Sequence, residues 1–151
     1  MRPALCLAVV VALSGCTAGA PAPPPDGGSS ATTTIDVNLT SHSSTASAYG
    51  TLAGYAPPVM NVAVGSTVRF VNSDSFAHTA TRSPGSTFPA GSPFSAGTQN
   101  QSGTRISQGW SSGTLPAGAA SQTILVDTAG TYLYGCFFHY GSPMRGAIVA
   151  L

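Results

Sequence analysis

Tyr134-Gly-Cys-Phe-Phe-His-Tyr-Gly-Ser-Pro-Met144 is the stretch from which the rest of this 151-residue sequence is interpreted. Within nine residues it places a thiol at Cys136, an imidazole at His139 and a thioether at Met144. A thiolate and two imidazoles in a trigonal plane, with a weak axial thioether, are the ligands of a blue-copper electron-transfer site. The stretch therefore predicts a copper site that still needs one imidazole.

His78 is the candidate for the missing imidazole. It ends the run Val68-Arg-Phe-Val-Asn-Ser-Asp-Ser-Phe-Ala-His78, whose apolar alternation is typical of a strand that delivers a side chain to the edge of a sheet. We therefore predict that one copper ion per chain is bound by His78, Cys136, His139 and Met144.

Each of these residues also has a purely structural interpretation. Cys is often a small buried hydrophobe and Met a filler of core gaps, and a lone His on a strand is more often part of the core than a ligand. The combination, order and spacing favour the metal site over these alternatives. His42, in Thr40-Ser-His-Ser-Ser, has no such companions, and we expect an exposed loop residue.

The remaining pattern predicts an all-β fold. Ile35, Val37 and Leu39 alternate with polar residues, and a second alternating run crosses the turn-like Gly65-Ser66. Tyr132, Tyr134 and Cys136 share one face of a further strand, residues 123–126 and 146–151 form two more, and 41–58 reads as a loop or irregular edge. Without any helical period, we predict a Greek-key β-sandwich of about seven to eight strands.

Residues 83–110 form an unusually long connection rich in Gly, Ser, Pro and Thr. It carries Phe88, Phe94 and Trp110. Two interpretations remain open for it. The segment shapes the surface beside the metal site or shields the metal, or its aromatic side chains cover an exposed flank of the sheet.

The motif Cys-x-x-His-x-x-x-x-Met resembles that of the cupredoxins, in particular the plastocyanin and pseudoazurin branch. The resemblance covers roughly residues 34–151, including V-G-x-T-V-x-F at 64–70, Asn72 and Asp74, G-T-Y-x-Y-x-C at 130–136, and M-R-G-x-I-V at 144–149. Thr79 stands where plastocyanins carry Asn, and Ala77 where they often carry Pro. Neither departure changes a candidate ligand. Both lie where they would affect the hydrogen bonds to the sulfur, and these hydrogen bonds tune the redox potential of such a site.

The N-terminus resembles a bacterial lipoprotein signal. A charged start and a short apolar run precede Leu13-Ser-Gly-Cys16. We expect residues 1–15 to be a signal peptide, Cys16 to be lipidated, 16–33 to be a flexible tether and 34–151 to be the copper domain, anchored in the cell envelope. The alternatives are an ordinary cleaved signal peptide, and a tether that packs on the domain as an extra strand.

Charge and cysteine content narrow the function. Beyond Arg2, four Arg balance four Asp, and Lys and Glu are absent, which argues against nucleic acid as a partner and against electrostatic steering. With Cys6 removed and Cys16 occupied by lipid, Cys136 is a lone thiol, which persists more readily in an oxidising compartment if metal occupies it.

We therefore expect a monomeric electron carrier rather than an enzyme. The resemblance implies that the ring edge of His139 lies near the surface, and its redox partners would dock on an apolar patch around it, formed by Phe137, Phe138, Tyr140 and Pro143. Alternatively, these side chains cap the core and partners bind elsewhere, for instance on the flank of Tyr132 and Tyr134. The alternative is copper delivery or sequestration, although such proteins usually expose Met-rich or paired-Cys sites. Copper enzymes related to the resembled family need additional His or Cys ligands, and only His42 is spare.

Overall fold

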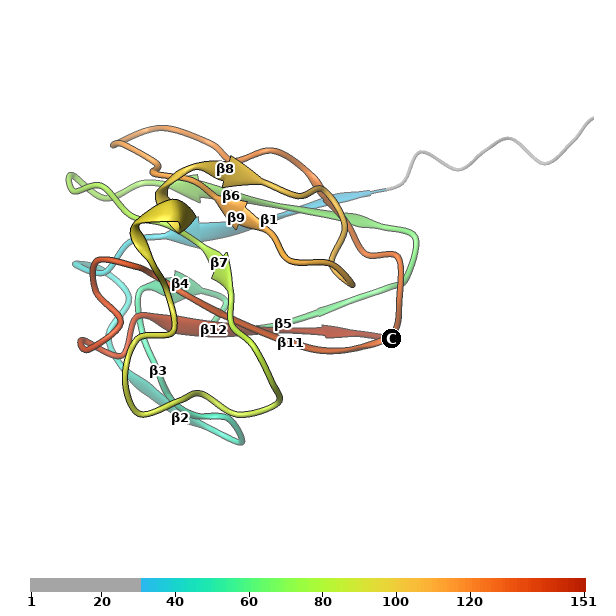
Figure 1. Ribbon diagram of the computed structural model, residues 1–151, viewed down its shortest axis with the longest axis horizontal. Coiled ribbons are helices and arrows are strands. Elements are labelled where there is room, and N and C mark those ends of the chain that lie inside the picture. The colour runs from blue at the N-terminus through green and yellow to red at the C-terminus, as the bar shows by residue number, and fades with distance from the viewer. Residues whose placement is uncertain (1–30) are drawn as a thin grey trace, which may run out of the picture.

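Two β-sheets face each other in the part of the chain that the computed structural model describes, residues 31–151 (Figure 1). One sheet has the strand order β10-β6-β1-β4 and the other β5-β12-β11-β7-β9-β8, with β2 and β3 forming a separate hairpin. The strands are β1 Thr32–Val37, β2 Thr45–Ser47, β3 Gly50–Leu52, β4 Tyr55–Ala56, β5 Val59–Val62, β6 Thr67–Asn72, β7 Thr81–Arg82, β8 Gln101–Ser102, β9 Ser111–Ser112, β10 Ile124–Leu125, β11 Gly130–Gly135 and β12 Arg145–Ala150.

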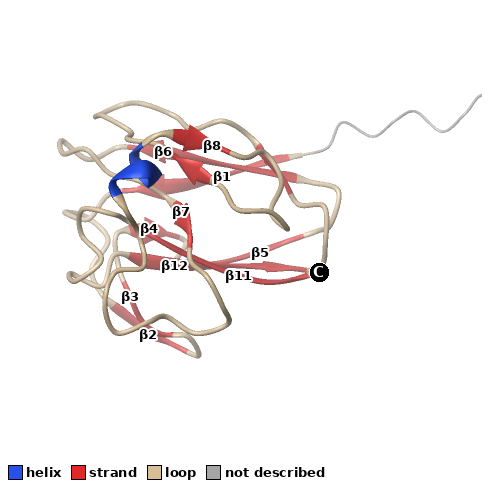
Figure 2. Ribbon diagram, in the orientation of Figure 1, coloured by secondary structure: helices blue, strands red, loops and turns tan. Residues whose placement is uncertain are grey.

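The predicted β-sandwich is confirmed, with more and shorter strands than expected. Seven of the twelve strands in residues 31–151 have three or more residues, and the other five have two. The described helical structure is one 3₁₀ turn, η1 at Ala96–Gln99 (Figure 2). No helix within residues 31–151 is long and apolar enough to cross a lipid bilayer.

Alternating apolar side chains explain the first sheet. Ile35 in β1 and Phe70 in β6 are fully buried, and they lie opposite each other in the parallel pairing of these strands. Gly65 makes the turn before β6 with a φ of +93°, a conformation that costs glycine little. The alternating run expected to cross Gly65-Ser66 does not continue before the turn, because Val64 is 44% exposed instead of buried.

Two expected boundaries are corrected by the strand pairing. β1 begins at Thr32, inside the segment predicted as tether, where the Thr32 hydroxyl hydrogen-bonds that of Thr67 at 2.8 Å. For residues 41–58 the irregular edge, and not the loop, is the correct alternative, because they contain the β2–β3 hairpin and β4, the edge strand that pairs with β1. Short polar strands without alternation leave little pattern to detect in a sequence.

An aromatic cluster fills the space between the sheets. Tyr134 lies 4.8 Å from Tyr55 and 5.1 Å from Phe70, measured between ring centroids, and Trp110 stacks on Phe70 at 5.4 Å. Tyr132, Tyr134 and Cys136 all belong to the core, but Cys136 follows β11 and does not lie on the strand as predicted. Gly146 is required here, because a Cβ at that position would lie 2.4 Å from the Tyr134 ring.

The aromatic side chains of the connection at 83–110 divide between the core and the loop after β11, and the two interpretations of its role stay untested. Trp110 belongs to the core. Phe88 and Phe94 instead pack against Tyr140, at 6.4 and 5.6 Å between centroids, and the Tyr140 hydroxyl donates a 2.8 Å hydrogen bond to the Pro89 carbonyl. The segment therefore supports the loop that follows β11.

Two loops converge at one end of the sandwich. The loop after β6 and the loop between β11 and β12 both lie at the left-hand end of Figure 1, and the C-terminus lies toward the opposite end. Residues far apart in the sequence thus meet at this end.

Candidate metal centre

Three predicted ligands come together where these loops meet. His78, Cys136 and His139 offer ligand atoms that all lie within 4.8 Å of one another. The Nδ1 atoms of the two histidines are 3.1 Å apart, and the Cys136 Sγ lies 3.6 Å from Nδ1 of His139 and 3.9 Å from Nδ1 of His78.

These distances fit one shared metal ion. Bonds of about 2.0 Å to nitrogen and about 2.3 Å to sulfur, as at zinc sites, would separate donor atoms in a trigonal plane by about 3.5 to 3.7 Å. The three separations of 3.1, 3.6 and 3.9 Å lie around this range. The group needs only small adjustments to bind a metal ion in a trigonal plane.

His78 does not lie on a strand, which corrects the predicted location. β6 ends at Asn72, and His78 follows in a loop. Two backbone hydrogen bonds with Leu115, of 3.1 and 2.8 Å, fix this part of the loop. The His78 side chain is fully buried. The loop therefore holds the imidazole in place as firmly as a strand would.

Cys136 is a buried thiol that accepts backbone hydrogen bonds. The Thr79 N–H donates to its sulfur at 3.4 Å, and the Thr79 hydroxyl accepts a hydrogen bond from the Phe137 N–H at 2.8 Å. A backbone group thus supplies the hydrogen bond to sulfur, so the Thr at position 79 does not remove it. Burial raises the pKa of the Cys136 thiol despite hydrogen bonds that oppose the shift. A metal cation would supply the charge that stabilises a buried thiolate.

Asp74 lies on the other side of His78. Its Oδ2 is 3.0 Å from Nε2 of His78, and Thr40 and Ser75 also donate hydrogen bonds to its carboxylate. Burial opposes ionisation, but the hydrogen bonds from His78, Thr40 and Ser75 outweigh it and hold the pKa of Asp74 well below its usual range. Asp74 was part of the family resemblance in the sequence, but its contact with His78 could not be predicted from it.

Met144 is fully buried beside the same loop. Its carbonyl accepts a 3.0 Å hydrogen bond from the Cys136 N–H. Its side chain lies against Gly54, where a Cβ would come within 2.7 Å of the Met144 Cγ. Gly54 was not identified from the sequence. The role of Met144 as axial ligand stays a prediction.

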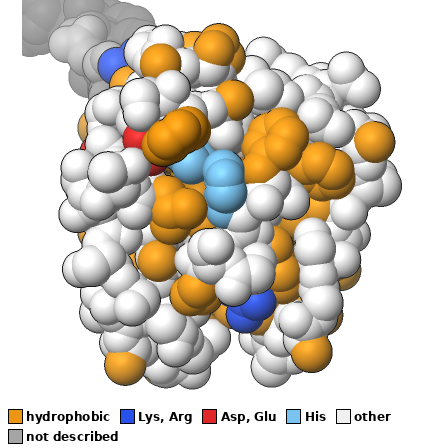
Figure 3. Space-filling view, turned by 90° about the vertical axis from the view of Figure 1, so that its left-hand side faces the viewer, with side chains coloured by type: hydrophobic (Ala, Val, Ile, Leu, Met, Phe, Trp, Pro, Cys, Tyr) orange, Lys and Arg blue, Asp and Glu red, His pale blue; other side chains and the backbone are white. Residues whose placement is uncertain are grey.

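His139 lies on the more exposed side of the centre. Burial and the neighbouring His78 lower the pKa of its imidazole. Phe138, 42% exposed, lies 6.2 Å from it between ring centroids, and Phe76 is 61% exposed. We call these two side chains the apolar patch. Figure 3 shows histidine side chains at this surface with hydrophobic side chains on both sides.

Two expectations about neighbouring residues are corrected. Tyr140 is only 3% exposed, because the 83–110 segment covers it, so it does not contribute to an exposed patch. His42 is partly buried and has a partner, since its Nε2 lies 2.6 Å from Oδ2 of Asp36. That contact joins β1 to the loop after it, which a local view of the sequence does not reveal.

A β-sandwich with a buried His-Cys-His group between two loops defines a mononuclear metal-binding protein. Residues 41–150 match the model of the copper binding proteins, plastocyanin/azurin family. The match spans most of the chain, and the protein belongs to this family. Its cofactor is copper, in agreement with the donor set of His78, Cys136 and His139.

Solved structures with a similar fold include three copper proteins. The purple cupredoxin from Nitrosopumilus maritimus is 20% identical, with a TM-score of 0.48 over 78% of this chain and 98% of that chain. Plastocyanin from Dryopteris crassirhizoma is 17% identical, with a TM-score of 0.47 over 79% and 100%. A mutant of amicyanin in the Cu(I) state is 20% identical, with a TM-score of 0.47 over 78% and 82%. No curated protein sequence matches significantly.

Proposed function

We propose that this protein is a blue-copper carrier of single electrons in the cell envelope, with His78, Cys136, His139 and Met144 as ligands of one copper ion. The observation that carries the proposal is the convergence of two imidazole nitrogens and one thiol sulfur at one end of a β-sandwich. Copper bound there would supply a one-electron couple between copper(II) and copper(I).

The chain's own residues explain how such a centre would work. Backbone hydrogen bonds fix His78 to Leu115 and Cys136 to Met144. Because both loops are tied to the sheets in this way, the donor atoms keep their positions when the charge of the centre changes. His78 and Cys136 are fully buried, which excludes water from that side.

Burial also favours electron transfer over copper delivery. A protein that hands its metal to a partner needs ligands that the partner can reach. Here Cys136, His78 and Met144 are each 0% exposed, and only His139 reaches toward the surface. Electrons can leave through a partly exposed imidazole, whereas the ion itself would remain enclosed.

The test is the absorption spectrum of the purified, copper-loaded chain, together with the copper stoichiometry. We expect one copper per chain and an intense visible band, because thiolate bound to copper(II) gives strong charge transfer. Two coppers per chain, or a colourless copper(II) form, would contradict the proposal.

The docking surface we propose for redox partners is the apolar patch of Phe76 and Phe138 beside His139. The exposed Phe138 next to the partly exposed His139 supports it, together with the exposed Phe76 two residues before His78. We expect short-lived complexes that bury less than about 1,200 Å² in total, as redox encounters do. The carrier itself would be a monomer.

The proposed membrane anchor is a lipid on Cys16, with residues 16–33 as the tether. The signal peptide at 1–15, Cys16 and the tether as far as residue 30 lie outside the described residues, so the support comes from the sequence of that segment. Detergent phase partitioning of the expressed protein tests it. Cys16→Ser should move the protein to the aqueous phase, and recovery of that variant with membranes at the wild-type level would refute the anchor.

A further inference from the structure

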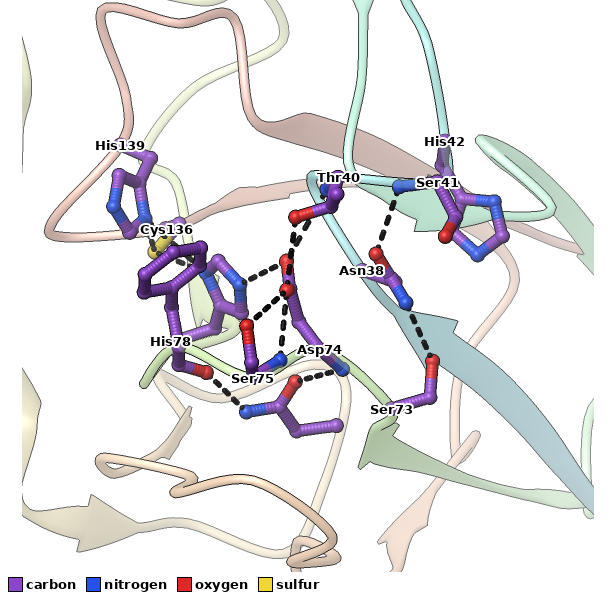
Figure 4. A network of polar contacts seen from close by, with 12 residues as sticks. Asn38, Thr40, Ser41, His42, Ser73, Asp74, Ser75, His78, Cys136 and His139 are labelled. Carbon is purple, nitrogen blue, oxygen red and sulfur yellow. Dashed lines mark hydrogen bonds and ion pairs between the residues drawn. The ribbon is translucent and has the colours of Figure 1, made fainter.

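A buried carboxylate stands behind one of the candidate ligands, on the side away from the sulfur. The Asp74 side chain is 2% exposed and that of His78 is 0% exposed, and Oδ2 of Asp74 lies 3.0 Å from Nε2 of His78. The other ring nitrogen, Nδ1, faces His139 and Cys136. Figure 4 shows the imidazole of His78 between Asp74 and the sulfur.

The hydrogen bonds around Asp74 favour an ionised carboxylate. The Thr40 N–H donates to Oδ2 at 3.2 Å, and the Thr40 hydroxyl and the Ser75 N–H donate to Oδ1 at 2.9 and 2.8 Å. The Ser75 hydroxyl also lies 3.5 Å from Oδ1, so five groups, with His78, address the two oxygens. Because the two backbone N–H groups can only donate, an ionised carboxylate, which only accepts, fits this set best. Nε2 of His78 then carries the hydrogen and donates to Asp74.

The negative charge of Asp74 has no cationic neighbour. Among residues 31–151, His78 is its one ion-pair partner, and no Arg lies within ion-pair distance. Because the carboxylate and the imidazole are both buried, solvent screens this charge weakly. Whatever binds at Nδ1 of His78 therefore experiences it.

Thr40 places the carboxylate from a distant part of the chain. It lies in the loop after β1, 34 residues before Asp74. Ser41 and Ser73 both hydrogen-bond to the side chain of Asn38, at 2.8 and 3.1 Å, which ties this loop to the end of β6 (Figure 4). The position of Asp74 thus follows from the pairing of β1 with β6.

We propose that Asp74 is a positioning residue that holds His78 with the hydrogen on Nε2, leaving Nδ1 free for copper, and that its charge lowers the redox potential of the centre. The inference rests on the proposed function. Copper(II) carries one more positive charge than copper(I), so a fixed negative charge stabilises the oxidised state more. A carboxylate that accepts a hydrogen bond from a ligating imidazole also makes that imidazole a stronger donor.

The test compares Asp74→Asn with Asp36→Asn in the full, copper-loaded chain. Both substitutions remove one carboxylate that contacts a histidine, but Asp36 contacts His42, which is no candidate ligand. We expect Asp74→Asn to weaken copper(II) binding about 10- to 100-fold relative to copper(I). A tenfold change corresponds to a rise of about 59 mV in midpoint potential for a one-electron couple. Asp36→Asn should leave the potential near that of the wild type.

An unchanged potential in a folded, coloured Asp74→Asn protein would overturn the proposal, as would an equal rise in Asp36→Asn. A second measurement does not depend on a variant that folds. Nitrogen-15 NMR of the metal-free wild-type chain at neutral pH should show His78 with its hydrogen on Nε2, and a hydrogen on Nδ1 would overturn the proposal. If the wild-type chain showed no thiolate–copper colour, the proposed function would fail, and the NMR result would still decide the role of Asp74.

Discussion

The two imidazoles of the centre lie in contrasting surroundings. His78 is fully buried, and the buried carboxylate of Asp74 lies 3.0 Å from its Nε2. His139 is partly exposed and lies beside the exposed Phe138. Within residues 31–151, the side chains that contact the ring nitrogens of His139 belong to His78 and Cys136, and none is acidic.

This difference indicates a division of labour between two ligands of the same type. The buried side has fixed charge and fixed hydrogen bonds, so it is suited to setting the redox potential. The exposed side has apolar surface and an accessible ring, so it is suited to contacting partners. Variants that change one property without the other test this division.

The largest effect should come from Cys136, whose sulfur lies close to both imidazoles. Cys136→Ser replaces the thiolate with a hydroxyl, a poor ligand for copper and one without the visible charge-transfer band. We expect complete loss of the colour, measured by absorption spectroscopy after copper loading. A serine variant that stayed coloured would show that the chromophore lies elsewhere.

On the exposed side, Phe138→Asp should slow electron exchange. Two like charges would face each other when two copies dock through this patch, and like charges at an interface reduce association rates. We expect electron self-exchange, measured by NMR line broadening in mixed oxidation states, to slow by about tenfold or more at low ionic strength, and to recover partly in salt. Potential and spectrum should change little.

Val64→Asp is the matched control for that substitution. Val64 is 44% exposed, close to the 42% of Phe138, and its N–H bonds to the Leu151 carbonyl away from the candidate centre. Its self-exchange rate should equal that of the wild type. If both variants slowed equally, charge alone and not the apolar patch would explain the effect. The buried Tyr140 is unsuitable for this test.

On the buried side, Met144→Gln should retain copper and lower the midpoint potential. An axial bond in such a site is long and weak, and the soft thioether favours copper(I) more than an amide oxygen does. Voltammetry together with copper analysis checks both parts. Loss of copper at neutral pH would mean that Met144 anchors the ion, which the proposed division does not allow.

The smallest effect should come from Tyr55→Phe. The Tyr55 hydroxyl donates a 2.5 Å hydrogen bond to the carbonyl of Thr79, the residue whose N–H reaches the sulfur. Leaving this buried carbonyl without its donor should lower the free energy of unfolding of the metal-free chain by about 1 to 3 kcal/mol, measured by urea denaturation. The spectrum should keep its shape. A marked spectral change would show that Tyr55 acts on the ligands as well as on stability.

The sequence was sufficient to predict the parts of the centre that are local. Cys136 and His139 lie in one loop with a recognisable spacing, and the alternation in β1 and β6 identified the sandwich. The axial role predicted for Met144 stays a prediction. His78 was identified by its residue type and the run before it, although it lies in a loop and not on the strand itself.

The parts that could not be predicted depend on contacts between distant segments. Thr40 reaches Asp74 only because β1 pairs in parallel with β6. Tyr140 is buried only because Phe88 and Phe94 return to it from a segment without periodicity. No local pattern encodes such contacts, since each requires the complete fold.

The position of β12 also has a consequence for the order of events during synthesis. β12 lies between β5 and β11 in its sheet, and it comes after all other strands of residues 31–151 in the sequence. Until residues 145–150 have been translated, β11 lacks its partner on one side and the loop with Cys136 and His139 is closed at only one end. Strand pairings between distant residues also form slowly. We therefore expect that a nascent chain cannot retain copper until residues 145–150 have emerged and β12 has paired with β11.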